Sequence, residues 1–319
     1  MNIAALTVTY NHERYIDDCI ASVVSQTIPV RQHVIVDNGS TDNTWKLLCE
    51  AAFCLPIQVH RLSPPVPIAQ AYAHALSLIG ADWVAILDGD DYWLPERCEI
   101  ACGGADKPDV AMWFSDVTLI TESGEPRGPY KWYMGPRSRP WSHGLLQAPL
   151  EPLLRLELSP PSVGMLLSMA HLQDMGGFIT DDDYPSFDLP TLIGLGRTAP
   201  FGYIPGRVGM YRKHSQSVTV STATDLLVKQ VEYCLGAVDR LGEAELPSTD
   251  IQKLKFDLEG LAAYGNATKA RREGDHRRAA QLYLRAARGA VQRDTAAKAS
   301  LRCLETIFRT AMSRLRHVR

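Results

Sequence analysis

The chain has 319 residues, of which 45% are hydrophobic and 22% charged, so it is long enough to bury a substantial core and has a globular composition. Its net charge of −3 is unevenly distributed, because 18 of the 33 Lys and Arg but only 11 of the 36 Asp and Glu lie from Leu226 onward. The acidic first part favours cation binding and argues against a nucleic-acid partner. For the basic end, three interpretations stay open: an anionic membrane surface, another protein, or a solvated helical face.

The seven cysteines are scattered, without Cys-x-x-Cys spacing or nearby histidine ligands, which argues against a zinc site. An unpaired set of this kind predicts a reducing compartment. The sequence starts with a strand-like segment, and no uninterrupted apolar run approaches the roughly 20 residues that span a bilayer. We therefore expect a cytoplasmic protein, either free or peripheral at the inner membrane surface.

The first third of the sequence alternates short β-rich runs with helical patterns, which predicts a parallel α/β sheet. In chain order we expect a strand at Ile3–Thr9, a helix at Tyr15–Gln26, a strand at His33–Val36, a helix from near Ser40, a strand at Ile57–Arg61, a helix at Ile68–Ile79 and a strand at Trp83–Leu87.

Polar residues follow three of these predicted strands: Asn11, then Asp37 and Asn38, then Asp88 and Asp90. In open α/β sheets, ligands bind outside the carboxyl ends of the strands, so these side chains are expected at one edge. The run from Asp88 to Asp91 crowds three carboxylates at a strand end. Such crowding is tolerated more easily when a divalent cation and a phosphorylated ligand neutralise it, so we predict a magnesium or manganese site that holds a nucleotide diphosphate.

The segment Pro126–Pro161 is rich in Pro, Gly, Arg and aromatic residues and predicts a long irregular loop. Such loops inside compact domains usually form lids or binding surfaces. Aromatic rings suit the C–H faces of pyranoses, so the loop is a candidate acceptor surface. The candidate acceptor residues are Tyr130, Trp132, Tyr133 and Trp141.

The pattern is helical beyond Thr224, which predicts a first domain at residues 1–222 and a helical region at residues 223–319. Ala262–Arg288 has the pattern of one tetratricopeptide-type hairpin, with packing positions at Ala267, Ala270, Ala279, Tyr283 and Ala286. The basic amphipathic tail at Ser300–Arg319 favours packing against the first domain or a second subunit over peripheral membrane contact.

The motifs of residues 1–220 form an ordered set: Thr9-Tyr10-Asn11, Ser25-Gln26-Thr27, Val36-Asp37-Asn38-Gly39-Ser40, Leu87-Asp88-Gly89-Asp90-Asp91, Gly176-Gly177-Phe178, Phe187-Asp188 and Tyr211-Arg212-Lys213-His214. This set resembles glycosyltransferase family 2, the inverting enzymes with a GT-A fold. The resemblance implies an α/β GT-A fold with a mostly parallel central sheet, here followed by an all-helical extension. It also implies metal-dependent transfer of a sugar from a nucleotide diphosphate to a hydroxyl acceptor in a bacterial glycan, glycolipid or glycoprotein.

By the same resemblance, nucleotide contacts are expected from Thr9, Tyr10, Asn11, Glu13, Asp37, Asn38 and Asp88. The resemblance also assigns a Mn²⁺ or Mg²⁺ ion to Asp90 and His214 and a supporting role to Asp91. Arg212 is a candidate for a phosphate contact, with an exposed salt bridge as the structural alternative. The resemblance makes Asp188 the base that takes the proton of the acceptor hydroxyl, with Asp181, Asp182 and Asp183 as rivals and a helix N-cap as the structural alternative.

Two features narrow this expectation. Family members usually have a second acid where this chain has Asn38, and an amide matches the two adjacent N–H donors of guanine less well than a carboxylate does, which favours a uridine or thymidine donor. Similar enzymes also carry Ala-Arg-Asn where this chain has Ala69-Gln70-Ala71, which leaves some donor contacts open.

Two other classes are weighed against a transferase. One is an inactive nucleotide-sugar-binding or scaffold protein that uses its helical tail for assembly, and the acids Asp88, Asp90 and Asp188 argue against it. The other is a sugar nucleotidyltransferase, which needs a glycine-rich phosphate loop near the first strand. Thr9-Tyr10-Asn11-His12-Glu13 contains no glycine.

Overall fold

The computed structural model describes residues 1–105, 107, 109–132, 144–181, 184–215, 217, 223–246 and 250–289, together with positions 299, 302, 303 and 306. These residues form two compact units. The first unit consists of the described residues up to 214 apart from segment 151–158, and the second consists of that segment and the described residues from 215 onward. The boundary predicted at residue 222 stays a prediction, since 218–222 lie outside the described residues.

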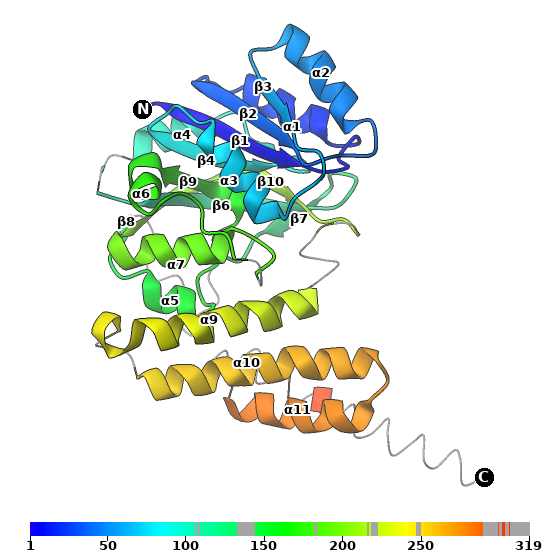
Figure 1. The fold of residues 1–319 in the computed structure, drawn as a ribbon, viewed down its shortest axis with the longest axis vertical. Helices are drawn as coiled ribbons and strands as arrows, with labels where there is room; N and C mark the ends of the chain where they lie inside the picture. Colours follow the sequence, from blue (N-terminus) through cyan, green and yellow to red (C-terminus); the bar gives the residue numbers. More distant parts are fainter. Residues whose placement is uncertain are drawn as a thin grey trace, which may run out of the picture. The chain divides into compact units, whose positions relative to one another are not determined.

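The first unit is built around a mixed sheet, in which ten strands are described (Figure 1). One half of the sheet is parallel, in the order β3 (Gln58–Arg61), β2 (Gln32–Asp37), β1 (Ile3–Thr9) and β4 (Trp83–Asp88). Every residue of β1 is buried, because helices cover both faces of a parallel sheet of this kind. Thr9 pairs with Asp37 and Val8 with Asp88, so the carboxyl ends of β1, β2 and β4 meet at one edge.

The other half of the sheet mixes directions. It contains β5 (Tyr92–Trp93), β6 (Met112–Ile120), β7 (Pro126–Pro129), β8 (Gly144–Leu146), β9 (Met165–Ser168) and β10 (Phe201–Arg212). Strands β6 and β10 are parallel, whereas β5, β7, β8 and β9 each run antiparallel to their neighbours. The prediction of one irregular loop over Pro126–Pro161 is therefore wrong. Short strands in this segment pair with β6 and β10, and such distant partners are not visible in a local pattern.

The strand order reverses at β1. The chain passes from β1 to β2 and β3 on one side and then returns to place β4 on the other. A crevice forms at such a reversal, outside the carboxyl ends of the two strands. The fold thus positions the loop after β1 and the acidic turn after β4 at the edge where a ligand is expected.

The helices of the first unit connect these strands: α1 (Ile16–Val24), α2 (Thr44–Cys54), α3 (Ile68–Ser77), α4 (Arg97–Gly104), α6 (Met169–Asp174) and α7 (Asp188–Thr198), with a 3₁₀ turn η1 (Ser162–Gly164). Helix α2 starts at Thr44, later than the predicted start near Ser40. The side chains of Asn11 and Glu13 explain the delay, because they hold the intervening turn through the backbone N–H groups of Thr41 and Asn43.

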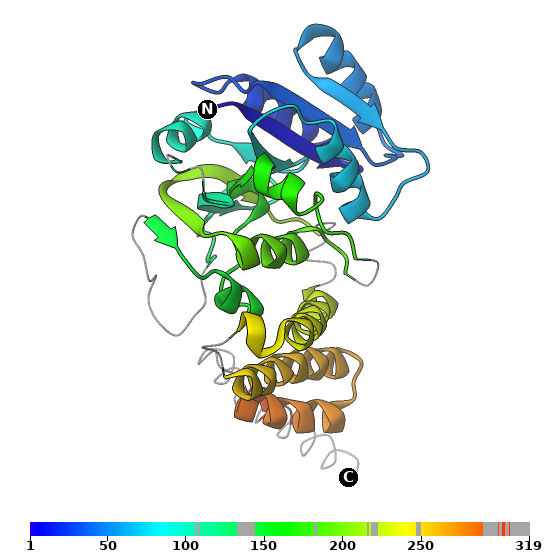
Figure 2. The ribbon, with the colours of Figure 1, turned by 60° about the vertical axis from the view of Figure 1, so that its left-hand side comes forward.

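The second unit is helical, with α5 (Leu150–Leu154), α9 (Ala223–Glu245), α10 (Ile251–Arg272) and α11 (His276–Gly289). Helices α10 and α11 lie side by side as the predicted hairpin (Figure 2). All five predicted packing positions are buried, namely Ala267, Ala270, Ala279, Tyr283 and Ala286. None of the described helices combines the length and the apolar character that a membrane crossing requires.

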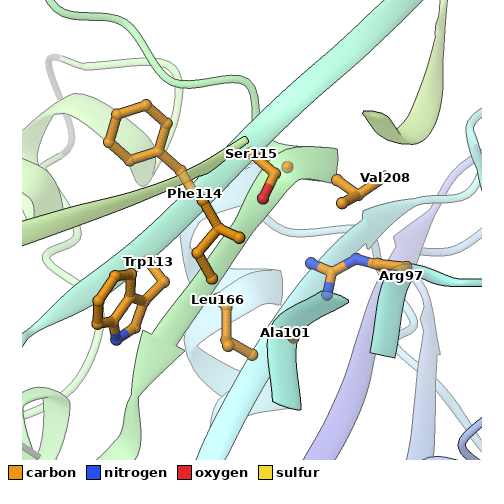
Figure 3. Close-up of a pocket in the computed structure, with 9 residues that line it drawn as sticks. Arg97, Ala101, Trp113, Phe114, Ser115, Leu166 and Val208 are labelled. Atoms are coloured by element: carbon orange, nitrogen blue, oxygen red, sulfur yellow. The ribbon is translucent and has the colours of Figure 1, made fainter. Parts of the chain in front are cut away.

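A small cavity in the core of the first unit is lined mainly by apolar side chains of β6, β9, β10 and α4 (Figure 3). Arg97 is buried against it, donates from Nη2 to the carbonyl oxygen of Met165 at 2.6 Å, and lies 4.2 Å from the ring centroid of Trp93. None of the predicted site residues lines this cavity, so the candidate site lies elsewhere, at the strand ends.

Candidate active site

The acidic turn begins with Asp88, the last residue of β4, and continues through Gly89 and Asp90. Gly89 allows the loop after β1 to approach this turn closely. A Cβ atom at residue 89 would lie 2.5 Å from Thr9 Oγ1 and 2.8 Å from His12 Nδ1, which is closer than real Cβ contacts. The glycine between the two acids is therefore required by the packing of two strand ends that are distant in the sequence.

His12, Asp90 and His214 form a cluster that fits a metal ion. Each offers one ligand atom, and these atoms all lie within 4.8 Å of one another. His214 Nε2 lies 2.9 Å from Asp90 Oδ2, and the rings of His12 and His214 meet edge to face with centroids 6.2 Å apart. Two imidazoles and a carboxylate are a donor set that divalent metals accept. The structure thus brings together Asp90 and His214, the predicted metal ligands.

His12 was not among the predicted site residues. The only indication in the sequence was that His12 directly follows Asn11 at the end of a strand. That indication is too weak to identify a metal ligand. Its Nδ1 lies 3.2 Å from the hydroxyl oxygen of Thr9, another predicted site residue. Burial lowers the pKa of His12 and outweighs the charge of Asp90, which acts to raise it. The lowered pKa favours the neutral imidazole that a metal requires.

The two acids of the turn have pKa values shifted in opposite directions. For Asp90, burial acts to raise the pKa, but the hydrogen bond with His214, together with the influence of the two neighbouring imidazoles, outweighs it and holds that pKa below its usual range. For Asp88, burial and the charge of Asp90 raise the pKa to about 6. Asp88 accepts hydrogen bonds from Ser162 Oγ at 2.6 Å and from the hydroxyl of Tyr72. Sequence reasoning missed Ser162 and Tyr72, because neither belongs to a motif.

Asp188 is the first residue of α7 and is half-buried. Its Oδ1 accepts a hydrogen bond from the backbone N–H of Leu189 at 2.8 Å. Burial raises the pKa of Asp188, and the charge of Asp188 in turn adds to the raised pKa values of Asp88 and Tyr130. Asp188 therefore shares one electrostatic environment with the acidic turn, although the two are far apart in the sequence.

Asp37 and Asn38 lie at the end of β2 and are both buried. Asp37 accepts hydrogen bonds from the backbone and hydroxyl of Ser40 and lies 3.2 Å from Nε of Arg61. The Asn38 amide donates to the carbonyl oxygen of Val66 at 2.9 Å and accepts from its N–H at 3.0 Å. In this structure, both polar atoms of the amide thus bind the loop before α3.

The loop after β1 carries the remaining predicted nucleotide contacts. Tyr10 is 47% exposed and so is accessible to a ligand. Asn11 has a left-handed backbone with φ of 56° and accepts a hydrogen bond from the N–H of Thr41 at 2.8 Å. Glu13 accepts from the backbone and side chain of Asn43. Asn11 and Glu13 thus tie the ends of β1 and β2 together at the edge of the sheet.

Arg212 binds the acidic turn through both its backbone and its side chain. Its side chain is 4% exposed, and its guanidinium donates to the carbonyl oxygens of Asp90 and Glu122 at 2.8 and 2.9 Å. Its backbone N–H donates to Oδ1 of Asp91 at 2.7 Å. These bonds within the protein occupy the guanidinium, and the phosphate contact of Arg212 stays a prediction. Arg212 and Asp91 fix the acidic turn to the end of β10.

The aromatic acceptor surface is also revised. Trp132 is 1% exposed, and its Nε1 donates to Asp116 at 2.8 Å while its ring packs against Phe114. A buried ring has no face left for a sugar, so its predicted acceptor role is wrong. Tyr130 is half-buried beside Tyr211. Burial, together with the charge of Asp188, raises the pKa of Tyr130. Tyr133 and Trp141 lie outside the described residues.

Comparisons with known proteins extend this picture. Residues 5–152 match the family model described as glycosyl transferase family 2. A putative teichuronic acid biosynthesis glycosyltransferase, TuaG of Bacillus subtilis (strain 168), is 30% identical over 125 residues, which are 39% of this chain and 50% of that protein. The hyaluronan synthase of Pasteurella multocida is 32% identical over 91 residues, 28% of this chain and 9% of that protein. The chain thus spans half or less of the length of these curated relatives.

Solved structures share the fold. TarS residues 1–349 of S. aureus, in complex with UDP-GlcNAc, superposes with a TM-score of 0.55 at 16% identity and covers 100% of this chain and 93% of that one. The mannosyltransferase PcManGT of Pyrobaculum calidifontis, in complex with GDP-Man and Mn²⁺, gives a TM-score of 0.57 at 16% identity over 96% and 86% of the two chains. The chain thus shares the GT-A fold of these solved glycosyltransferases, and its residues 5–152, just under half of the chain, match glycosyl transferase family 2.

Proposed function

We propose that the chain is a metal-dependent inverting glycosyltransferase that moves a sugar from a nucleotide diphosphate, a UDP-sugar, to a hydroxyl group of a glycan, glycolipid or glycoprotein. The observation that supports this most is the cluster of His12, Asp90 and His214 at the strand ends, whose candidate ligand atoms all lie within 4.8 Å of one another. Acids gathered at the carboxyl ends of parallel strands suit a cation and a diphosphate.

In this proposal, Asp188 removes the proton of the acceptor hydroxyl as that oxygen attacks the anomeric carbon. Inversion in one step needs a single base on the face opposite the leaving diphosphate. The burial that raises the pKa of Asp188 makes its carboxylate a stronger base. Asp90 and His214 would hold Mn²⁺ or Mg²⁺, and the bound ion would offset the charge that develops on the departing diphosphate.

The donor nucleotide would lie along the ends of β1, β2 and β4, against Tyr10, Asp37 and Asp88. The absence of a carboxylate at position 38 supports a uridine rather than a guanosine donor, because a carboxylate matches the two adjacent N–H donors of guanine better than an amide whose polar atoms bind Val66. Titration calorimetry with UDP and GDP in the presence of Mn²⁺ tests this choice. Tighter binding of GDP than of UDP would reject the uridine donor.

The test of the mechanism is the substitution Asp188→Asn. It should keep donor binding, because Asp90 and His214 are unchanged, and it should lower sugar transfer by about 10²- to 10⁴-fold through loss of the base. A screen of sugar nucleotides with Mn²⁺, in which nucleotide release is followed, identifies the donor and provides the assay. Calorimetry with the same donor measures binding separately.

Asp181→Asn is the matched control, because Asp181 is a rival base from the same segment. It should keep turnover near the wild-type rate. If Asp188→Asn turns over normally and Asp181→Asn does not, the base is misassigned. A wild-type chain that binds UDP-sugars without any metal-dependent turnover would instead favour the inactive scaffold.

A further inference from the structure

The cluster of His12, Asp90 and His214 includes one residue, His12, that no sequence motif predicts as a metal ligand. His12 lies in the loop after β1, Asp90 in the turn after β4, and His214 in the segment after β10. Donor atoms that share an ion at about 2.0–2.2 Å lie at most about 4.4 Å apart. The three candidate ligand atoms lie within 4.8 Å of one another, so small side-chain rotations bring all of them onto one ion.

We propose that His12 is a protein ligand of the cation, alongside Asp90 and His214, and that the two imidazoles make the site select Mn²⁺ or a later first-row transition metal over Mg²⁺. This inference rests on the proposed function, because it concerns the cation of that same site. It deepens that proposal by naming a third ligand and by narrowing the class of metal.

The surroundings of His12 support a ligand role. Thr9 Oγ1, at 3.2 Å from Nδ1, fixes the orientation of the ring, and a metal-ligating histidine is usually held in this way through its second nitrogen. With Nδ1 bonded to Thr9, Nε2 is the nitrogen that would bind the ion. Gly89 adds a second, independent constraint, because any side chain at that position would meet His12 Nδ1 at 2.8 Å and push the ring out of place.

The metal preference follows from the donor atoms. Mg²⁺ prefers six oxygens in a regular octahedron, whereas imidazole nitrogen suits the transition metals. With two nitrogens and one oxygen from the protein, affinity should rise from Mg²⁺ to Mn²⁺ and further to Co²⁺, as the general order of divalent metals predicts. A site made of Asp90 and His214 alone would show a smaller spread of affinities.

The experiment is calorimetric titration of the full chain with Mg²⁺, Mn²⁺ and Co²⁺, without donor. His12→Ala should weaken Co²⁺ binding by at least about tenfold and Mn²⁺ binding by less, because the bond from nitrogen to Co²⁺ is the stronger one. His12→Asp replaces the nitrogen by an oxygen, so it should retain a ligand and shift the ratio of Co²⁺ to Mg²⁺ affinity toward Mg²⁺. The matched control is His74→Ala, an exposed histidine of α3, which should bind like the wild type.

Unchanged Co²⁺ affinity in His12→Ala, or an unchanged Co²⁺ to Mg²⁺ ratio in His12→Asp, would overturn the proposal. So would a wild-type chain that binds no Co²⁺. A purely structural role of His12 would lower all affinities together and leave their ratio unaltered. The metal titration contains no donor, so it tests the role of His12 as a ligand by itself. An absence of sugar transfer in the separate assay would count against the proposed function and not against that role.

Discussion

At the scale of single residues, the site depends on which polar atoms stay accessible to a ligand and which are hydrogen-bonded within the protein. Arg212 and Asn38 are both occupied by backbone partners, so their side chains mainly fix the geometry of the turns around them. Tyr10 and Asp188 stay partly exposed. Residue types alone do not distinguish these two groups, because both are polar and both follow predicted strands or precede helices.

The close packing at Gly89 gives a prediction on stability. Gly89→Ala introduces a methyl group against Thr9, which is buried, and against His12, so it should lower the free energy of unfolding by about 1–3 kcal/mol. Gly103→Ala is the control, since Gly103 in α4 has open space around it and an alanine there should stabilise the helix by about 0.5–1 kcal/mol. Urea unfolding followed by fluorescence measures both. Equal stabilities of the two variants would contradict the steric argument.

At the scale of elements, β2 places an ionisable side chain in the interior of the sheet. His33 is buried within the strand, its Nε2 lies 3.1 Å from Thr7 Oγ1 of β1, and burial lowers its pKa to about 3. An ordinary histidine titrates near pH 6.5. Between these values the unfolded chain binds a proton that the folded chain does not, so stability is complete above about pH 6.5 and falls as the pH decreases toward 3.

His33→Gln should remove this pH dependence. At pH 5 the wild type is expected to lose about 2 kcal/mol relative to pH 7 through His33, at 1.36 kcal/mol per pH unit, and the variant should not show that loss. All six tryptophans precede residue 142, so their fluorescence reports unfolding of the first unit in urea at the two pH values. His74→Gln, at an exposed helix position, should keep the wild-type pH dependence. A pH dependence that persists in His33→Gln would exclude His33 as its source.

At the scale of the whole molecule, the second unit is not continuous in the sequence. Arg155, from the segment between β8 and β9, pairs with Asp257 of α10 at 3.3 Å and with Glu151 at 2.9 Å. The side chains of Arg155 and Asp257 are 14% and 10% exposed, so this ion pair is largely shielded from water. The helical unit therefore includes a segment that lies before β9 and β10 in the sequence.

A double-mutant cycle with Arg155→Met and Asp257→Asn should give a coupling energy of about 1–2 kcal/mol in urea unfolding followed by circular dichroism, because neighbouring partners in a shielded pair couple strongly. The control is the exposed pair of Arg285 and Glu259, with side chains 65% and 49% exposed. Its coupling should stay below about 0.5 kcal/mol, because solvent screens it. A coupling energy near zero for the first pair would show that segment 151–158 is held by other contacts.

The sequence alone determined the parallel half of the sheet, the acids at its strand ends and the helical hairpin. These depend on local patterns: the spacing of apolar residues, the polar residue that follows each strand, and the small residues at helical intervals. The prediction of Asp90 with His214 depended on a motif, and the structure places the two side chains 2.9 Å apart.

The tertiary structure decided what those patterns do not contain. His12 joins Asp90 and His214 only because Gly89 lets two remote loops pack together, and Arg212 and Trp132 are occupied only because distant backbone and side-chain atoms surround them. The physical reason is that burial and hydrogen-bond partners are properties of the packed molecule. A sequence pattern fixes where a side chain leaves its strand, whereas the contacts of that side chain are set by segments far along the chain.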